Sequence, residues 1–207
     1  MSHAEFPTSA RVVIIGGGII GCSVAYHLAD MGCKDVVLLE QSQLTAGTTW
    51  HAAGLMTTYG STSETSIAMR KYSRELYARL EEETGQATGF KACGFIEVAS
   101  DADRLEEQRR VAAFNRWHGI DVEEISPGEI QALFPLANVD NVLAGFYTAT
   151  DGRINPVDVT MALAKGARMR GVRIIQYTPV KGVLSHRGAA TGVSTEKGDI
   201  KAEVVVN

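Results

Sequence analysis

The sequence has 207 residues, a formal net charge of −4, 45% hydrophobic and 21% charged residues. This composition excludes a disordered, fibrous or membrane-spanning chain, and the absence of a basic surplus argues against a nucleic-acid partner. Its three cysteines (Cys22, Cys33 and Cys93) show no Cys-x-x-Cys spacing, which argues against a zinc site or disulfide framework and for a reducing compartment. No signal or transit peptide pattern precedes residue 11, so we expect a cytoplasmic bacterial-type protein, or a mitochondrial matrix protein if it is eukaryotic.

A strand, a glycine-rich turn and a helix open the regular structure. Val12–Ile15 is an apolar run typical of a buried parallel strand, and Gly16, Gly18 and Gly21 follow as Gly-x-Gly-x-x-Gly. The first glycine allows a tight turn, the second lets backbone approach a pyrophosphate, and the third lets the helix pack closely. The helix N-terminus favours phosphate. The helix carries one apolar face, made of Ile20, Val24, Ala25 and Leu28.

The next predicted strand, Val36–Leu39, ends at Glu40, about 20 residues beyond the glycines. A carboxylate in this position can accept hydrogen bonds from both hydroxyls of an adenosine ribose, and it disfavours a 2′-phosphate. The order of strand, turn, helix, strand and acid predicts a dinucleotide site. By itself, this fingerprint fits NAD and FAD equally well.

The middle of the chain does not keep the β-α-β rhythm. Periodicity predicts a helix over 63–84, with a core-facing stripe and a stop at Gly85, then a strand over 94–100 and a charged helix over 101–118. The members of the stripe are Met69, Tyr72, Leu76 and Leu80. Ser126-Pro-Gly-Glu129 is a capping box that opens a short helix, and a strand over 142–147 follows. We interpret this block as a second lobe inserted into the nucleotide domain.

The last part returns to the first rhythm. Asn155 caps and Pro156 begins a helix that ends at Gly171, and an apolar parallel strand over 172–177 comes next. Two short segments then flank a turn at Arg187-Gly188 as an antiparallel hairpin. We expect 202–206 to be one more buried strand.

Residues 41–55 are too rich in small and hydroxyl side chains for a helix and too apolar for a solvated loop, which suits backbone wrapped around a ligand. Here the chain resembles the flavin-dependent dimethylglycine and sarcosine dehydrogenase family, within the larger D-amino-acid-oxidase-like FAD superfamily. The resemblance is close at Gly47–Leu55, at Arg79–Gln86 and at Asp151–Pro156, and it covers essentially the whole chain. It implies that the dinucleotide is FAD.

The family's histidine in Trp-His-Ala-Ala-Gly-Leu carries FAD covalently, which assigns this role by resemblance to His51. Without the family, a histidine between Trp50 and Ala52 is more often a packed or hydrogen-bonded residue. In the superfamily, backbone after the returning strand, here Val180, meets the adenine. The expected cofactor-binding residues are therefore Gly16, Gly18, Ile19, Ile20, Gly21, Glu40, Gln41, Gly47, Thr48, Thr49, Trp50, His51, Ala52, Ala53, Gly54, Leu55 and Val180.

The resemblance also implies an activity, the oxidation of an N-methylated glycine (dimethylglycine or sarcosine) by hydride transfer from an N-methyl carbon to flavin N5. An electron-transfer protein is the implied acceptor. Three alternatives stay open: a flavin amine oxidase that uses oxygen, a non-catalytic relative of the pyruvate dehydrogenase phosphatase regulatory subunit, and a plain NAD-binding enzyme. The run Gly47–Leu55 disfavours the last of these. No catalytic base and no metal ligand is predicted.

The expected fold class is α/β, a Rossmann-like three-layer FAD-binding domain with an inserted α+β substrate lobe that is incomplete in this chain. We expect the FAD-binding domain over 1–90 and 151–207, and the lobe over 91–150. By resemblance, we expect these residues to be the N-terminal part of a longer enzyme and to be inactive alone.

Overall fold

The structure is a computed structural model that describes residues 5–207, and its α/β architecture confirms the predicted fold class. The chain forms two compact units. The first comprises residues 5–53, 80–88 and 155–207, and the second comprises residues 54–79 and 89–154. Within the described residues, no helix is long and apolar enough to cross a membrane.

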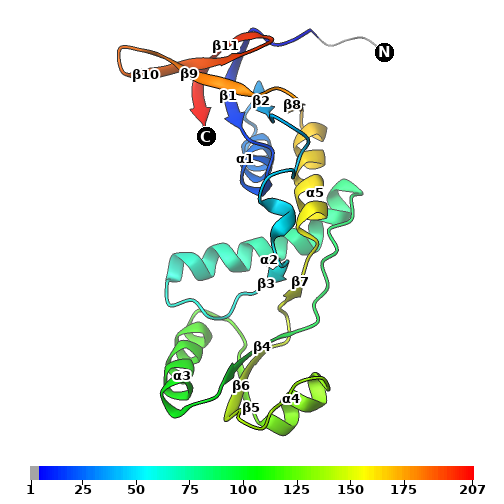
Figure 1. The fold of residues 1–207 in the computed structure, drawn as a ribbon, viewed down its shortest axis with the longest axis vertical. Coiled ribbons are helices and arrows are strands. Elements are labelled where there is room, and N and C mark those ends of the chain that lie inside the picture. The colour runs from blue at the N-terminus through cyan, green and yellow to red at the C-terminus, as the bar shows by residue number, and fades with distance from the viewer. Residues whose placement is uncertain (1–4) are drawn as a thin grey trace. The chain divides into compact units, whose positions relative to one another are not determined.

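The first unit is built on a six-stranded sheet in the order β8-β2-β1-β11-β10-β9 (Figure 1). Strands β8, β2, β1 and β11 run parallel, and β10 and β9 continue the sheet antiparallel. The strands are β1 (Ser9–Ile15), β2 (Val36–Leu39), β8 (Arg173–Ile175), β9 (Val180–His186), β10 (Ala189–Thr195) and β11 (Gly198–Val206). The helices are α1 (Ile19–Asp30), the short 3-10 helix η1 (Thr49–His51) and α5 (Pro156–Met169).

Helices α1 and α5 pack against each other, and Figure 1 shows them side by side. Their close approach depends on Gly166, because a Cβ there would lie 2.8 Å from the ring of Tyr26. The predicted start of α5 is confirmed, since the Asn155 side chain accepts from the amides of Val157 and Asp158.

The apolar face expected for α1 is wrong at Ile20, which is 75% exposed. The buried face is turned toward α5 and the sheet instead, and it consists of Cys22, Ala25, Tyr26 and Ala29. Ile20 lies in the first turn of α1, where it lines a hollow beside the glycine turn.

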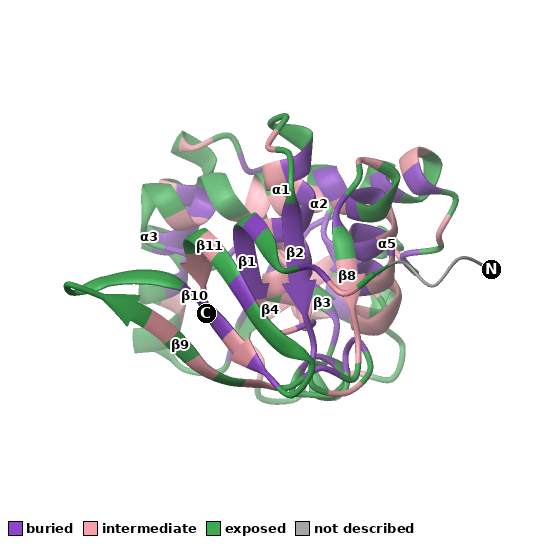
Figure 2. Cartoon of the chain, turned by 90° about the horizontal axis from the view of Figure 1, so that it is seen from above, coloured by how far each residue is buried: buried purple, intermediate pink, exposed green. Residues whose placement is uncertain are grey.

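Two strands near the end of the chain differ from expectation. β8 stops at Ile175 because Gln176 and Tyr177 bond to the loop after β2: Gln176 Oε1 accepts from Leu44 N, and Tyr177 N donates to Ser42 O. β11 is longer than expected, and it is mostly not buried (Figure 2), since Ile200 is its only fully buried residue. β1 and β10 satisfy its backbone on both edges, which fixes the strand without covering its faces.

The second unit holds two small antiparallel sheets, one ordered β4-β6-β5 and the other formed by β3 and β7. Its strands are β3 (Leu55–Met56), β4 (Phe95–Ala99), β5 (Glu123–Ile125), β6 (Ala144–Thr148) and β7 (Gly152–Arg153). Its helices are α3 (Ala102–Trp117), α4 (Pro127–Leu133) and the larger part of α2 (Glu64–Thr84). The capping box predicted at Ser126 and Glu129 is confirmed at the start of α4.

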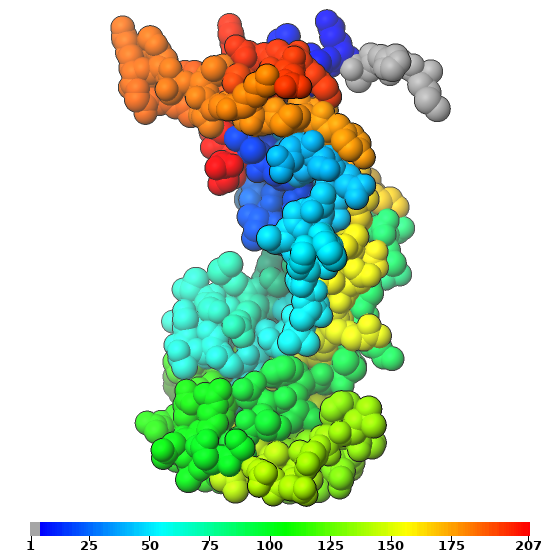
Figure 3. All heavy atoms as spheres, viewed as in Figure 1, coloured from blue at the N-terminus to red at the C-terminus, as the bar shows by residue number. Residues whose placement is uncertain are grey.

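Residues 54–79 lie in this unit, although the sequence placed them with the nucleotide domain. The physical reason is that β3 pairs with β7, and that the buried Asp151 accepts hydrogen bonds from Thr58. Figure 3 shows the two segments, in cyan and green, packed together. The functional roles of the units as FAD-binding domain and substrate lobe remain predictions.

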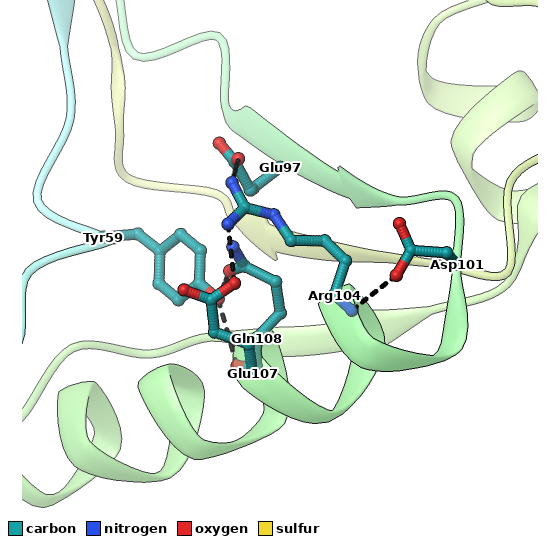
Figure 4. Close-up of polar contacts among 6 residues, drawn as sticks. All are labelled: Tyr59, Glu97, Asp101, Arg104, Glu107 and Gln108. Atoms are coloured by element: carbon teal, nitrogen blue, oxygen red, sulfur yellow. Dashed lines mark hydrogen bonds and ion pairs between the residues drawn. The ribbon is translucent and has the colours of Figure 1, made fainter.

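A buried tyrosine connects the parts of this unit. Tyr59 is 2% exposed, stacks on Phe146 with ring centroids 6.2 Å apart, and donates to Gln108 of α3 (Figure 4). Nearby, Arg104 pairs with Glu107 and Glu97 at 2.6 and 3.6 Å. Because that arginine is largely exposed, its ion pairs contribute little, and burial of the tyrosine dominates.

Of the four residues predicted to form the core-facing stripe of α2, two are buried and two are exposed. Leu76 and Leu80 are buried, but Met69 is 66% and Tyr72 42% exposed. Ile67, which the periodicity did not single out, is buried with Tyr59 in the core of the second unit.

Strand β7 lies between β3 and the backbone at Lys91, and this close packing leads to a stability prediction. A Cβ on Gly152 would lie 2.0 Å from the carbonyl oxygen of Lys91, so Gly152→Ala must push two backbones apart. We expect a loss of about 1–3 kcal/mol in the free energy of unfolding, measured by denaturant titration. The matched control is Gly128→Ala in α4, where a Cβ meets nothing within 4 Å. The control should be neutral or slightly stabilising, and an equal loss in both variants would contradict the argument.

Candidate functional site

The glycine turn joins β1 to α1 in a conformation that depends on its glycines. Gly16 has φ +105°, a backbone conformation that L side chains rarely adopt, and its amide donates to Leu39 O of β2 at 2.8 Å. A Cβ on Gly21 would lie 2.0 Å from Gly16 O. The helix can therefore start directly against the turn only with glycine at both positions.

The N-terminus of α1 offers free donors beside a hollow. Gly18 is the N-cap and supplies no side chain, and the amide of Ile19 donates to Thr49 Oγ1 at 3.0 Å. Within residues 5–207, the amides of Ile20 and Gly21 donate to no acceptor. A hollow of about 280 Å³ lies over them, and Gly16, Gly18 and Thr48 are also among its lining residues. Orphan amides at a helix N-terminus suit an anion such as a pyrophosphate.

Glu40 is directed inward beside this turn. It is 9% exposed, and its two carboxylate oxygens accept from Gly17 N at 2.6 Å and from Ser42 N at 2.8 Å. Each oxygen keeps a further lone pair, so the carboxylate can still accept a hydroxyl. The carboxylate of Glu40 thus links the glycine turn to the loop after β2 through these two hydrogen bonds.

The segment after Glu40 is bound to the glycine turn at two points. Thr45 N donates to Gly17 O at 3.1 Å, and the buried Thr49 accepts from Ile19 N. Between them Gly47 and Thr48 are exposed. These contacts bring the predicted segment against the predicted phosphate turn, which the sequence order alone did not require.

His51 ends η1 and is exposed, as are its neighbours Trp50, Ala52 and Ala53. The rings of Trp50 and His51 have centroids 3.7 Å apart and are tilted by 44°. An exposed imidazole of this kind is accessible to a ligand.

The remaining predicted residues are Gln41, Gly54, Leu55 and Val180. Gln41 is exposed, Gly54 and Leu55 belong to the second unit, and Val180 is the first residue of the edge strand β9. The chain just before Val180 is held to Glu40, whose carbonyl accepts from Thr178 N at 2.8 Å.

Two positions that the sequence analysis left out organise this region. Gly17 donates to Glu40 and accepts from Thr45, and a Cβ there would lie 2.5 Å from Leu44. Three consecutive glycines were the available signal. Thr45 has φ +71°, which no sequence pattern marks at a threonine.

Cys22 lies beneath the turn, and its thiol donates to Gly17 O at 3.7 Å. Burial raises the pKa of Cys22 to about 12, so the thiolate is not populated near neutral pH. We therefore assign it a packing role.

The parallel sheet, the glycine turn with free amides and the acid at the end of β2 define a dinucleotide-binding protein. A family model for FAD dependent oxidoreductases (DAO) matches residues 11–207. The chain belongs to this family. The orphan amides and the glycine cradle fit the pyrophosphate of FAD.

Relatives and solved structures agree with this assignment. The chain is 45% identical to dimethylglycine dehydrogenase of Rattus norvegicus over 100% of its own length and 24% of that protein. It is 43% identical to the pyruvate dehydrogenase phosphatase regulatory subunit of Mus musculus (97% and 23%), and 38% identical to sarcosine dehydrogenase of Homo sapiens (97% and 22%). The L-proline dehydrogenase structure from P. horikoshii matches with a TM-score of 0.90 and 30% identity, over 98% of this chain and 53% of that one. The chain spans about a quarter of the length of these curated relatives.

Proposed function

We propose that this chain forms the FAD-binding part of an oxidoreductase that oxidises an N-methylated glycine, dimethylglycine or sarcosine. The observation that carries the proposal is the cradle between Gly16 and Gly21, with free amides and Glu40 beside it, in a chain 45% identical to a dimethylglycine dehydrogenase. Similarity to sarcosine dehydrogenase of Homo sapiens and to glycine oxidase of Bacillus licheniformis supports a redox reaction.

In this proposal, each part of FAD is bound by a different group of residues. The amides of Ile20 and Gly21 hold the pyrophosphate, Glu40 holds the ribose, and backbone at Val180 meets the adenine. The segment from Gly47 to Leu55 follows the rest of the cofactor, with Trp50 and His51 at the isoalloxazine. His51 would carry the flavin covalently, because a neutral imidazole nitrogen is a competent nucleophile. Its bond to the 8α-methyl carbon would replace a C–H bond, and the two electrons would pass to the flavin ring and from there to the electron acceptor.

When bound, FAD supplies the hydride acceptor. The substrate amine must lose its ammonium proton before it can give up hydride, so a desolvated pocket favours the reaction. We assign no base to this chain. An electron-transfer protein is the proposed acceptor, and the proposed location is the bacterial cytoplasm or, in a eukaryote, the mitochondrial matrix.

A regulatory role is the second candidate, because the similarity to the phosphatase regulatory subunit covers 97% of the chain at 43% identity. An oxidase that uses oxygen is the third, because 4-methylaminobutanoate oxidase of Paenarthrobacter nicotinovorans is 38% identical. The electron acceptor distinguishes a dehydrogenase from an oxidase.

The proposal is tested with the complete protein that the gene encodes, loaded with FAD and mixed anaerobically with dimethylglycine or sarcosine. We expect the flavin absorbance band to bleach with at least one of them, and oxygen to restore it slowly if the acceptor is a protein. Flavin that stays oxidised with both amines would favour the regulatory candidate.

His51→Ala should separate covalent from non-covalent binding. In acid-denatured parent protein, we expect the flavin colour and mass to stay with the polypeptide, whereas the variant should release FAD but still bind it before denaturation. His27→Ala is the matched control, since that ring lies on α1 and hydrogen-bonds to Ser23. Parent protein that loses its flavin on denaturation would refute the covalent link.

Glu40→Ala should weaken capture of FAD about ten- to a hundredfold, since a charge-assisted hydrogen bond is worth about 1.5–3 kcal/mol. The measurement is an FAD titration of apoprotein in the His51→Ala background, where binding is reversible. Because the variant also leaves Gly17 N and Ser42 N unpaired, its folding is checked by denaturation. Asp35→Asn, at the other end of β2, is the control, and equal affinity in both variants would refute the ribose role.

A further inference from the structure

A second hollow, of about 580 Å³, lies within the second unit between β3 and α2. Its walls combine three kinds of side chain. Apolar groups come from Leu55, Met69 and Ile154, hydroxyls from Ser66 and Ser73, and one cation from Arg70. A mostly apolar hollow with a few polar groups is the usual form of a small-molecule site.

Arg70 is the unusual member of this set. It is partly buried, and its Nη1 donates to Tyr59 O at 2.8 Å. No carboxylate of residues 5–207 lies within ion-pair distance of it, whereas Arg104 and Arg109 on α3 each pair with a glutamate. A guanidinium has five N–H donors in a planar fork, so most of them are left for a ligand.

The carbonyl that holds Arg70 is itself fixed. Asp151 is fully buried, and its carboxylate accepts from Thr58 N and Thr58 Oγ1, both at 2.7 Å, and from Tyr59 N at 3.3 Å. The ring of Tyr59 stacks on the ring of Phe146. The guanidinium therefore rests against rigid backbone, and such preorganisation lowers the entropy lost on binding.

We propose that Arg70 is the anchor for the carboxylate of a small amino acid, with Leu55, Met69 and Ile154 facing the N-methyl end. This assignment rests on the proposed function, and it names the substrate-binding residue of that reaction. A carboxylate is the planar, bidentate partner that a guanidinium fork matches best. Leu55 is both the last residue of the proposed flavin segment and a lining residue of this hollow.

The competing explanation is that Arg70 only supports the backbone at Tyr59. The two differ in what they recognise, because an anchor acts on ligands with a carboxylate and a backbone support acts on all ligands alike. Arg74 is a matched control. It lies one turn further along the same helix, and its Nη1 donates to Thr150 Oγ1 at 2.7 Å.

The experiment compares Arg70→Gln, Arg70→Lys and Arg74→Gln in the complete protein loaded with FAD. The substrates are dimethylglycine and dimethylaminoethanol, which lacks the carboxylate. We expect Arg70→Gln to raise KM for dimethylglycine about ten- to a hundredfold with a much smaller change in kcat. Arg70→Lys should fall between parent and Arg70→Gln, and Arg74→Gln should match the parent. The KM for the carboxylate-free amine should not change.

A binding measurement separates this proposal from the proposed function. Calorimetric titration with methoxyacetate, an unreactive carboxylate, should show binding to the parent and a loss of about tenfold or more with Arg70→Gln. This arm does not need turnover. Equal affinity of Arg70→Gln and Arg74→Gln for methoxyacetate, or an equal rise in KM for both amines, would overturn the anchor. Parent protein that binds methoxyacetate through Arg70 but oxidises no amine would refute only the proposed reaction.

Discussion

The first unit depends on one close passage of backbone, where Gly21 of α1 lies against the carbonyl of Gly16. A single methyl group at Gly21 would come within 2.0 Å of that oxygen, so the helix could not begin where it does. Because the helix begins there, the amides of Ile20 and Gly21 find no acceptor within residues 5–207, and they face a hollow. Tight packing and a set of free amides that suits an anion thus follow from the same two glycines.

Glu40 extends this constraint to the rest of the site. Its carboxylate accepts from Gly17 and Ser42, while its main chain bonds to Ile175 and Thr178 after α5. One residue therefore joins the turn, the loop after β2 and the returning strand. Charge-assisted hydrogen bonds to backbone amides are among the stronger kinds, so an acid at this position stabilises the site whether or not a ribose is present.

The sequence predicted those parts of the molecule that local rules determine. Gly16 and Gly21, the capping box at Ser126 and the Asn155 cap are short-range features, and each has a backbone reason that can be read along the chain. What the sequence missed depends on distant partners. Met69 has the periodicity of a core residue, but no element of the described chain covers it, and the buried acid at Asp151 is explained by Thr58, 93 residues away.

Overall similarity gives no preference between catalysis and regulation, since identity to a dehydrogenase is 45% and to a regulatory subunit 43%. The proposed anchor Arg70 offers a physical criterion instead, because its guanidinium is partly buried and no carboxylate of residues 5–207 lies within ion-pair distance of it. Partial burial of a cation without a counter-ion is unfavourable. At Arg70 the hydrogen bond to Tyr59 O offsets part of this cost, and in our proposal the carboxylate of a small acid would offset the rest.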